Sequence, residues 1–258
     1  MIDGSFWELN IGETLSPAEV SAITLSLRVA FWGVISSLPL AIGVAWLLSR
    51  RTFLGHTILD GLIHLPLILP PVVTGYALLL LFGRRGLIGA WLAENFGIVF
   101  AFRWTGAALA AAVMGFPLMV QAIRSAFDAV DEKLEATART LGASGPWVFL
   151  TITLPLILPG VLTGCVLAYA KSLGEFGATM TFVSNIPGET QTLPLAIYGM
   201  LQTPDGEAAV WRLSLISIAL AMLALSVSGP AARALQRRLR GRDRENHRQL
   251  RVNKQKEN

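Results

Sequence analysis

Charged side chains are scarce in this chain of 258 residues. Only 15% of its residues are Asp, Glu, Lys or Arg, whereas a soluble domain carries about a quarter. Hydrophobic residues make up 53% of the chain, and the mean hydropathy is +0.56. The lack of charge excludes an ordinary soluble domain and indicates an integral membrane protein.

Motifs for catalysis and metal binding are also lacking. The one cysteine, Cys165, excludes an internal disulfide, so cysteine usage does not indicate a redox compartment. The nucleotide-binding pattern G-x-x-x-x-G-K-[ST] is missing, as are H-E-x-x-H and G-x-S-x-G. The three histidines, at positions 56, 64 and 247, do not have the spacing of metal ligands. We therefore expect no catalytic residues, no metal site and no bound cofactor in this chain, and no ability to hydrolyse ATP.

Long apolar segments are what the chain does have. A helix needs about 20 apolar residues to cross a bilayer core, and five segments qualify: Val20–Leu48, Ile58–Phe82, Trp104–Phe127, Leu154–Leu173 and Trp211–Ala232. The pair Arg50-Arg51 directly follows the first segment, which places that end in the cytoplasm by the positive-inside rule. We expect the N-terminus outside and the C-terminus inside, although Arg84-Arg85 would then lie outside, against the rule.

Three regions follow from this pattern. Residues 1–19 are expected to form an external segment, and residues 20–232 the transmembrane domain, with residues 128–153 as a cytoplasmic loop. Residues 233–258 contain ten of the 21 Lys and Arg residues, which is typical of a disordered cytoplasmic tail near anionic lipid rather than of a nucleic-acid site. Between the spans, residues 87–103 are expected to be external or re-entrant, and residues 193–201 to form a short external helix.

The cytoplasmic loop contains a predicted amphipathic helix over Val130–Leu141. Asp131 and Glu132 place acids at its N-terminus, where the helix dipole favours them. Glu135 and Arg139 are four residues apart and can form a surface ion pair. On the opposite face lies an apolar stripe of Val130, Leu134, Ala138 and Leu141. Such a stripe needs a protein partner, either this chain or another.

The end of this helix carries a resemblance to a known family. Gly142 is a predicted helix C-cap. The pair Leu154-Pro155 follows, and its proline lies thirteen residues after Gly142. The run EATARTLGAS with this spacing resembles the EAA loop of the permease subunits of bacterial ABC importers, although Thr137 replaces one alanine. The resemblance implies an all-α, type I importer-like bundle of about five transmembrane helices with a cytoplasmic coupling helix. It further implies that a separate ATP-binding subunit contacts Glu135, Ala136, Ala138, Leu141, Gly142 and Ala143.

A second motif, SLGEFGATMTF, follows the fourth predicted span at residues 172–182. An ionisable residue at a membrane boundary is either functional or an interfacial group, here one that can pair with Lys171. Small residues at this point permit close helix contact or a narrow gate. We therefore take the following as candidate residues of a translocation pathway: Gly174, Glu175, Phe176, Gly177 and Thr179.

The two motifs together resemble the permease subunits of molybdate importers, over about residues 21–232. That resemblance implies a homodimer in the bacterial inner membrane with the pathway between its subunits, a cytoplasmic ATPase and a periplasmic oxyanion-binding protein. It also implies molybdate as the substrate, with tungstate as a second one. A sulfate/thiosulfate permease remains the first alternative. A stand-alone secondary transporter and an intramembrane enzyme are others, but both need charged or catalytic groups within the spans, and few are present.

The chain also contains an internal echo. Residues 65–78 read LPLILPPVVTGYAL and residues 154–167 read LPLILPGVLTGCVL. Each segment begins or lies within a predicted span that runs from inside to outside. We hypothesise that the two segments occupy equivalent places around one pathway, as repeats do in some transporters.

Overall fold

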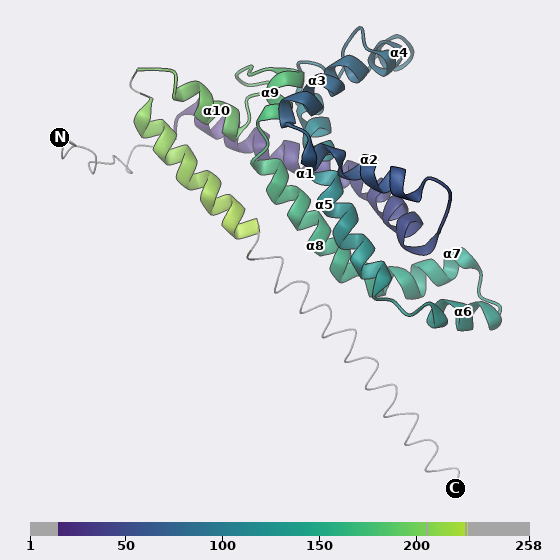
Figure 1. Ribbon diagram of the computed structural model, residues 1–258. Coiled ribbons are helices and arrows are strands. Elements are labelled where there is room, and N and C mark those ends of the chain that lie inside the picture. The colour runs from purple at the N-terminus through teal and green to yellow at the C-terminus, as the bar shows by residue number, and fades with distance from the viewer. Residues whose placement is uncertain (1–14, 205, 225, 227–258) are drawn as a thin grey trace.

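The computed structural model describes residues 15–204, 206–224 and 226, and these residues form helices joined by loops, without strands (Figure 1). Four helical stretches are long and apolar enough to cross a membrane: Pro17–Arg50, Trp104–Asp128, Gly145–Leu173 and Glu207–Ala224. A bent helix pair provides a fifth when it is counted as one span. The predicted all-α membrane bundle is confirmed. The expectations for residues 1–14 and for the basic tail lie outside the described residues.

Helix α1 (Pro17–Arg50) begins at a complete capping box. The backbone N–H of Glu19 donates to Ser16 Oγ at 3.3 Å, and the backbone N–H of Ser16 donates to Glu19 Oε2 at 2.7 Å. These two bonds satisfy donors that a helix start otherwise leaves unpaired. The Glu19 side chain also forms an ion pair with Arg212 at 3.0 Å, which ties α1 to the final helix at residues 207–224.

Helix α5 (Trp104–Asp128) lies at the centre of the bundle, between α1 and α8 (Leu154–Leu173) (Figure 1). Glycines set its distance to both neighbours. A Cβ added at Gly33 of α1 would lie 3.0 Å from Ala108 O, and one added at Gly164 of α8 would lie 3.0 Å from Met119 O. Small residues of this kind allow membrane helices to pack backbone against backbone.

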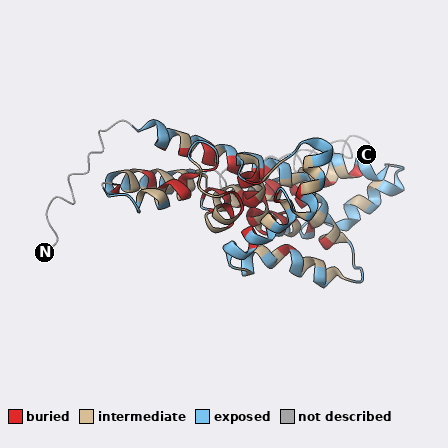
Figure 2. Cartoon of the chain, turned by 90° about the horizontal axis from the view of Figure 1, so that it is seen from above, coloured by how far each residue is buried: buried red, intermediate tan, exposed pale blue. Residues whose placement is uncertain are grey.

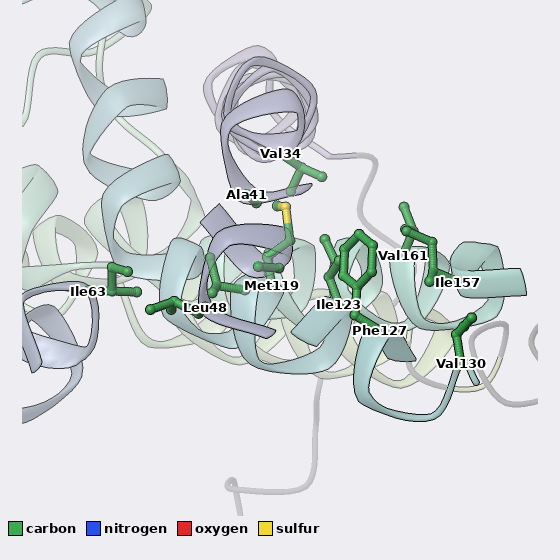
Figure 3. Close-up of a cluster of buried hydrophobic side chains, with 13 residues drawn as sticks. Val34, Ala41, Leu48, Ile63, Met119, Ile123, Phe127, Val130, Ile157 and Val161 are labelled. Carbon is green, nitrogen blue, oxygen red and sulfur yellow. The ribbon is translucent and has the colours of Figure 1, made fainter. Parts of the chain in front are cut away.

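The largest buried cluster joins four helices. Its side chains come from α1, α5, α8 and α2 (His56–Ile68), and Figure 3 shows them meeting between the ribbons: Val34, Ala41, Leu48, Ile63, Met119, Ile123, Phe127, Ile157 and Val161. Buried residues concentrate in the middle of the molecule, and the outward faces of the helices are exposed (Figure 2). Only 6% of the most apolar window of the final helix is buried within this chain. Apart from Leu213, which is buried against α1 and α10, most of its apolar side chains are therefore left for lipid or for another chain.

The second predicted span, Ile58–Phe82, is not one continuous helix. Helix α2 ends at Ile68, and α3 (Pro71–Phe82) continues at an angle of 115° to it. The break falls at Pro70, whose φ of −53° and ψ of 133° are outside the helical region. A proline disfavours the helical conformation of the residue before it, so Pro71 explains why the chain turns at Pro70.

The internal echo therefore does not give two equivalent helices. The second copy continues through Pro159 without a break, as part of α8. The residue after this proline is Gly160, which does not restrict Pro159 as Pro71 restricts Pro70. The two copies differ in backbone shape, because one bends and the other continues as a helix. That they occupy equivalent places around one pathway stays a prediction. The shared Thr-Gly pairs still lie at close contacts, since Gly75 packs against α9 and Gly164 against α5.

The remaining short helices lie at the two ends of the bundle. At one end lie α6 (Glu132–Thr140) and α7 (Gly145–Val148), the latter followed by the π-helical turn η2 (Phe149–Thr153); the opposite end holds α3 and the three helices α4 (Leu87–Phe96), α9 (Gly177–Val183) and α10 (Leu193–Met200) (Figure 1). Helix α10 confirms the short helix expected over residues 193–201. Helix α4 ends where Gly97 takes a φ of +65°.

Candidate functional site

The predicted coupling helix forms as α6, slightly shorter than expected. Its N-cap is Asp131, whose side chain accepts the backbone N–H of Lys133 at 2.9 Å. After Leu141, Gly142 takes a φ of +87°, and a Cβ there would meet nothing within 4 Å. The glycine is therefore needed for its left-handed backbone conformation and not for space. The predicted helix end is confirmed.

The orientation of α6 differs from the sequence-based interpretation. The sequence places Glu135 on the solvent-exposed side of the helix, yet only 13% of its side chain is exposed. Leu134 is 50% exposed and Leu141 is 84% exposed, although both belong to the apolar stripe. Within this chain the helix turns Glu135 inwards, whereas 72% of the Glu132 side chain is exposed. Most of the apolar stripe is left for a different partner.

Glu135 lies at the centre of a polar network that joins α6 to two membrane helices. Its carboxylate lies 3.5 Å from Arg50 Nη2, at the end of α1, and accepts a hydrogen bond from Thr153 Oγ1 at 2.9 Å, at the start of α8. The predicted pair with Arg139 is present at 3.6 Å. Arg50 also contacts Glu132 at 3.0 Å and donates to the carbonyl oxygen of Val130 at 3.1 Å.

This network fixes the position of a helix that is short and mostly polar. Nine residues are too few for a stable isolated helix. Arg50 and Thr153 are both shielded, with 10% of the Arg50 side chain and 2% of Thr153 exposed. Their bonds to Glu135 are therefore less weakened by water than those of a surface ion pair. A displacement of α6 must move the ends of α1 and α8 or break these bonds.

Several large apolar side chains are exposed on the coupling elements: Leu134, Leu141, Trp147 and Leu150, each at least half exposed. Ala136 and Gly142 are exposed as well, and Ala138 and Ala143 are partly exposed. All six candidate coupling residues thus lie together on α6 and on the turn after it. Five face outwards at least in part, and Glu135 faces the chain.

The candidate pathway residues gather at the opposite end of the bundle, around α9 (Figure 1). Glu175 is 3% exposed and lies between α8 and α9. Its Oε1 accepts the backbone N–H of Ala178 at 2.9 Å, and its Oε2 lies 3.5 Å from Lys171 Nζ. The carboxylate therefore binds the first turn of α9 and pairs with Lys171, as one of the two interpretations expects.

The other residues of this group pack α9 against α3 and α10. A Cβ at Gly177 would lie 2.8 Å from Pro71 Cβ, so this glycine permits a close contact with α3. The Phe176 ring lies 5.0 Å from the ring of Tyr198 on α10. Gly174 is the C-cap of α8 and is exposed, whereas Thr179 is 1% exposed. These contacts hold the end of α8 in place.

Sequence reasoning missed two residues of the coupling network. The sequence indicates Arg50 only as a signal of membrane topology, and it indicates no role for Thr153. Neither has a local pattern that indicates its partner, because Glu135 is 85 residues from Arg50 and 18 from Thr153. The Glu19–Arg212 pair was missed for the same reason, with a separation of 193 residues.

Comparison with known proteins gives a consistent result. Residues 37–241 match the family described as "Binding-protein-dependent transport system inner membrane component". The chain is 60% identical over 225 residues to the molybdenum transport system permease protein ModB of Escherichia coli K12, covering 87% of this chain and 98% of that relative. It is 56% identical to ModB of Haemophilus influenzae, covering 86% of this chain and 96% of the relative. The sulfate transport system permease protein CysT of Escherichia coli K12 is 34% identical, covering 86% of this chain and 79% of that protein.

Solved structures agree on the fold. A bacterial ABC transporter involved in the import of the acidic polysaccharide alginate matches with a TM-score of 0.68 at 15% identity, covering 88% of this chain and 83% of that one. The MetNI methionine ABC transporter matches with a TM-score of 0.60 at 11% identity, covering 84% of this chain and 94% of that one. The helical bundle, the family match and the relatives above agree: the chain is a multi-pass membrane protein that belongs to the family of inner-membrane components of binding-protein-dependent transport systems.

Proposed function

We propose that this chain is the transmembrane permease subunit of an ABC importer for molybdate, with tungstate as a second substrate. The observation that carries the proposal is the identity of 60% and 56% to two molybdenum transport permeases over nearly their whole length. The sulfate permease shares only 34%. A sulfate/thiosulfate importer is therefore the less favoured alternative.

The transporter is a homodimer with the pathway at the subunit interface. Two copies of an ATP-binding subunit bind on the cytoplasmic side, and a periplasmic oxyanion-binding protein delivers the substrate. The chain itself holds no cofactor, and ATP is bound by the partner. Support comes from the exposed apolar final helix, which needs lipid or a second copy, and from the alginate ABC transporter, which was solved in complex with a periplasmic protein.

Coupling takes place at the α6–α7 end, which faces the cytoplasm. The exposed apolar side chains Leu134 and Leu141, with the alanines and Gly142 beside them, contact the ATP-binding subunit. Glu135 acts from the inner side of α6, by holding the helix to α1 and α8. ATP binding and hydrolysis then shift the permease between inward-open and outward-open states, because the partner binds these states differently.

At the other end, residues 174–179 form the proposed outer gate. Glu175 holds the first turn of α9 through the Ala178 N–H, so a movement of α8 is transmitted to α9. Neutral donors in this region suit an oxyanion that must be released after binding.

Substrate uptake into vesicles tests the proposal. The chain is reconstituted with an ATP-binding subunit and a periplasmic binding protein, and the uptake of labelled molybdate and sulfate is compared. We expect ATP-dependent uptake of molybdate in preference to sulfate. A preference for sulfate would establish the alternative importer, and uptake that persists without the ATP-binding subunit would establish a secondary transporter.

Capture of the ATP-binding subunit tests the coupling surface. Gly142→Pro places a fixed negative φ at a position that needs +87°, so we expect loss of capture. Gly188→Pro is the matched control, because Gly188 also has a positive φ, of +78°, but lies far from α6 in the sequence, before α10. Unchanged capture by the Gly142 variant would refute the docking role.

Accessibility labels at Ser49 and Gly206 test the five-span topology. We expect the two residues on opposite sides of the membrane, and finding both on the same side would refute the topology.

A further inference from the structure

Two adjoining hollows separate the end of α1 from the coupling elements, and we call them together the α1–α6 groove. The first has a volume of about 390 Å³ and lies between the end of α1 and α6. The second has a volume of about 340 Å³ and lies between α1 and the segment α7–η2. Trp46, Glu135 and Arg139 line both hollows, so the groove is continuous.

The first hollow is positively charged. Four basic side chains line it, against two acidic ones: Arg50, Arg51, Lys133 and Arg139, with Glu132 and Glu135. Both carboxylates already lie within 3.5 Å of Arg50. The Arg51 guanidinium lies over the Trp46 ring at 5.7 Å, and Lys133 makes no ion pair with any residue that the structure describes. Positive charge is thus left over at this point.

The second hollow is mainly apolar and extends along a membrane-spanning helix. Besides the shared residues, its wall includes Ile42 and Gly43 of α1 and Val148 and Phe149 opposite them. Ile42 lies eight residues before Arg50 on α1, which is about 12 Å along a helix. The groove therefore runs from a cationic mouth at the end of the span towards the apolar part of the same span.

We propose that the α1–α6 groove binds one anionic phospholipid. The phosphate group lies between Arg51 and Lys133, and an acyl chain extends past Trp46 along Ile42 and Phe149. A cationic mouth attracts a headgroup with net negative charge, and tryptophan is favoured where the headgroup region meets the hydrocarbon. A water-soluble acidic protein segment fits less well, because half of the groove lies along a helix that crosses the membrane.

The bound lipid joins α1 to α6 and α7 beside the Glu135 network. One wall of the groove carries Arg51 and Trp46, and the other carries Lys133 and Phe149. A molecule that contacts both walls stabilises the arrangement in which the two are close. Leu134, Leu141 and Gly142, which contact the ATP-binding subunit in the proposed function, line neither hollow. Ala136 lines the first hollow, so the two surfaces meet at this residue.

Lipid retention by the full-length chain tests the proposal. The chain is purified in detergent, incubated with equal amounts of phosphatidylglycerol and phosphatidylcholine, and examined by native mass spectrometry. Gly43→Leu fills the second hollow, and a Cβ at this position meets nothing within 4 Å, so the fold is preserved. We expect retention of phosphatidylglycerol to fall about tenfold, which corresponds to lost contact with about two methylene groups.

Gly61→Leu is the matched control. Gly61 is also an exposed helical glycine with open space at its Cβ, but it lies on α2 and lines neither hollow. We expect this variant to retain phosphatidylglycerol as the unmodified chain does. Equal retention by the Gly43 and Gly61 variants, or no preference of the unmodified chain for phosphatidylglycerol, would overturn the proposal.

A second pair of variants tests the charge. The double variant Arg51→Gln with Lys133→Gln should lose the preference for phosphatidylglycerol over phosphatidylcholine. The double variant Arg84→Gln with Arg85→Gln removes the same charge at the turn between α3 and α4 and should keep the preference. If the first double variant loses capture of the ATP-binding subunit while its lipid preference is unchanged, these cations serve a protein contact and the lipid proposal is wrong.

Discussion

Thr153→Val is the sharpest perturbation of the Glu135 network. Thr153 is 2% exposed, and its hydroxyl donates to Glu135 Oε1 at 2.9 Å. Valine has nearly the same shape but no hydroxyl, so the change removes this bond while the packing at the start of α8 stays almost the same. The charges of Glu135, Arg50 and Arg139 remain in place.

The expected size follows from the kind of bond that is lost. A hydrogen bond to a charged group contributes about 1.5–3 kcal/mol. Since about 1.4 kcal/mol corresponds to a tenfold change in an equilibrium constant, the ratio of attached to detached α6 should fall by about 10- to 150-fold. Because α6 has only nine residues, detachment should also unfold it.

Amide hydrogen exchange measures this ratio directly. We expect the backbone amides of residues 136–141 to exchange faster by the same factor, and those of α5 to be unchanged. Thr151→Val is the matched control, because the Thr151 hydroxyl is exposed and donates to Trp147 O within its own helical segment. Equal exchange rates at α6 in the Thr153 variant and in the unmodified chain would refute the claim that Glu135 holds the helix.

Three further predictions concern other parts of the chain. Leu141→Asp changes a residue that is 84% exposed. Since surface changes stay within about 0.5 kcal/mol, the thermal midpoint should shift by no more than about two degrees, yet capture of the ATP-binding subunit in a pull-down should be abolished. Pro71→Gly should straighten the 115° bend between α2 and α3. Spin labels at residues 58 and 82 should then move apart towards about 36 Å, which is the length of a continuous helix between these positions. An unchanged distance would contradict the role given to Pro71. Glu19→Gln should weaken the attachment of the final helix by about 1.5–3 kcal/mol, because it removes the charge from the 3.0 Å contact between Glu19 and Arg212. Faster amide exchange confined to residues 207–224 would show it.

The sequence predicts the long helices well and their faces poorly. Helix α8 begins and ends at the predicted residues, because its bounds follow from hydropathy, Leu154-Pro155 and Gly174. The predicted stripe does not behave as one face, because Val130 precedes α6 and is buried, whereas Leu134 and Leu141 are exposed. Periodicity alone does not say whether a face meets this chain or another. The side chain that meets this chain is Glu135, through partners on α1 and η2 that no local pattern indicates.

The echo shows a second limit. Residues 65–78 and 154–167 share ten of their fourteen positions. Only the first segment contains a helix break, and this difference follows from one of the four positions that differ, Pro71 against Gly160. Two segments with similar sequences can therefore differ in backbone conformation when one of the differing residues is a proline.

The seam between α5 and α8 has a mechanical consequence. At Gly115, Gly160 and Gly164 the two helices approach so closely that an added Cβ would press on the opposite helix. At these three glycines the opposite helix lies in direct contact, so a larger side chain brought to any of them would collide with it. Because α8 has 20 residues and is about 30 Å long, a displacement where α7 enters α8 and one at its other end are linked over that distance by the close packing on α5. Glu175 lies two residues beyond the far end of α8, next to the start of α9.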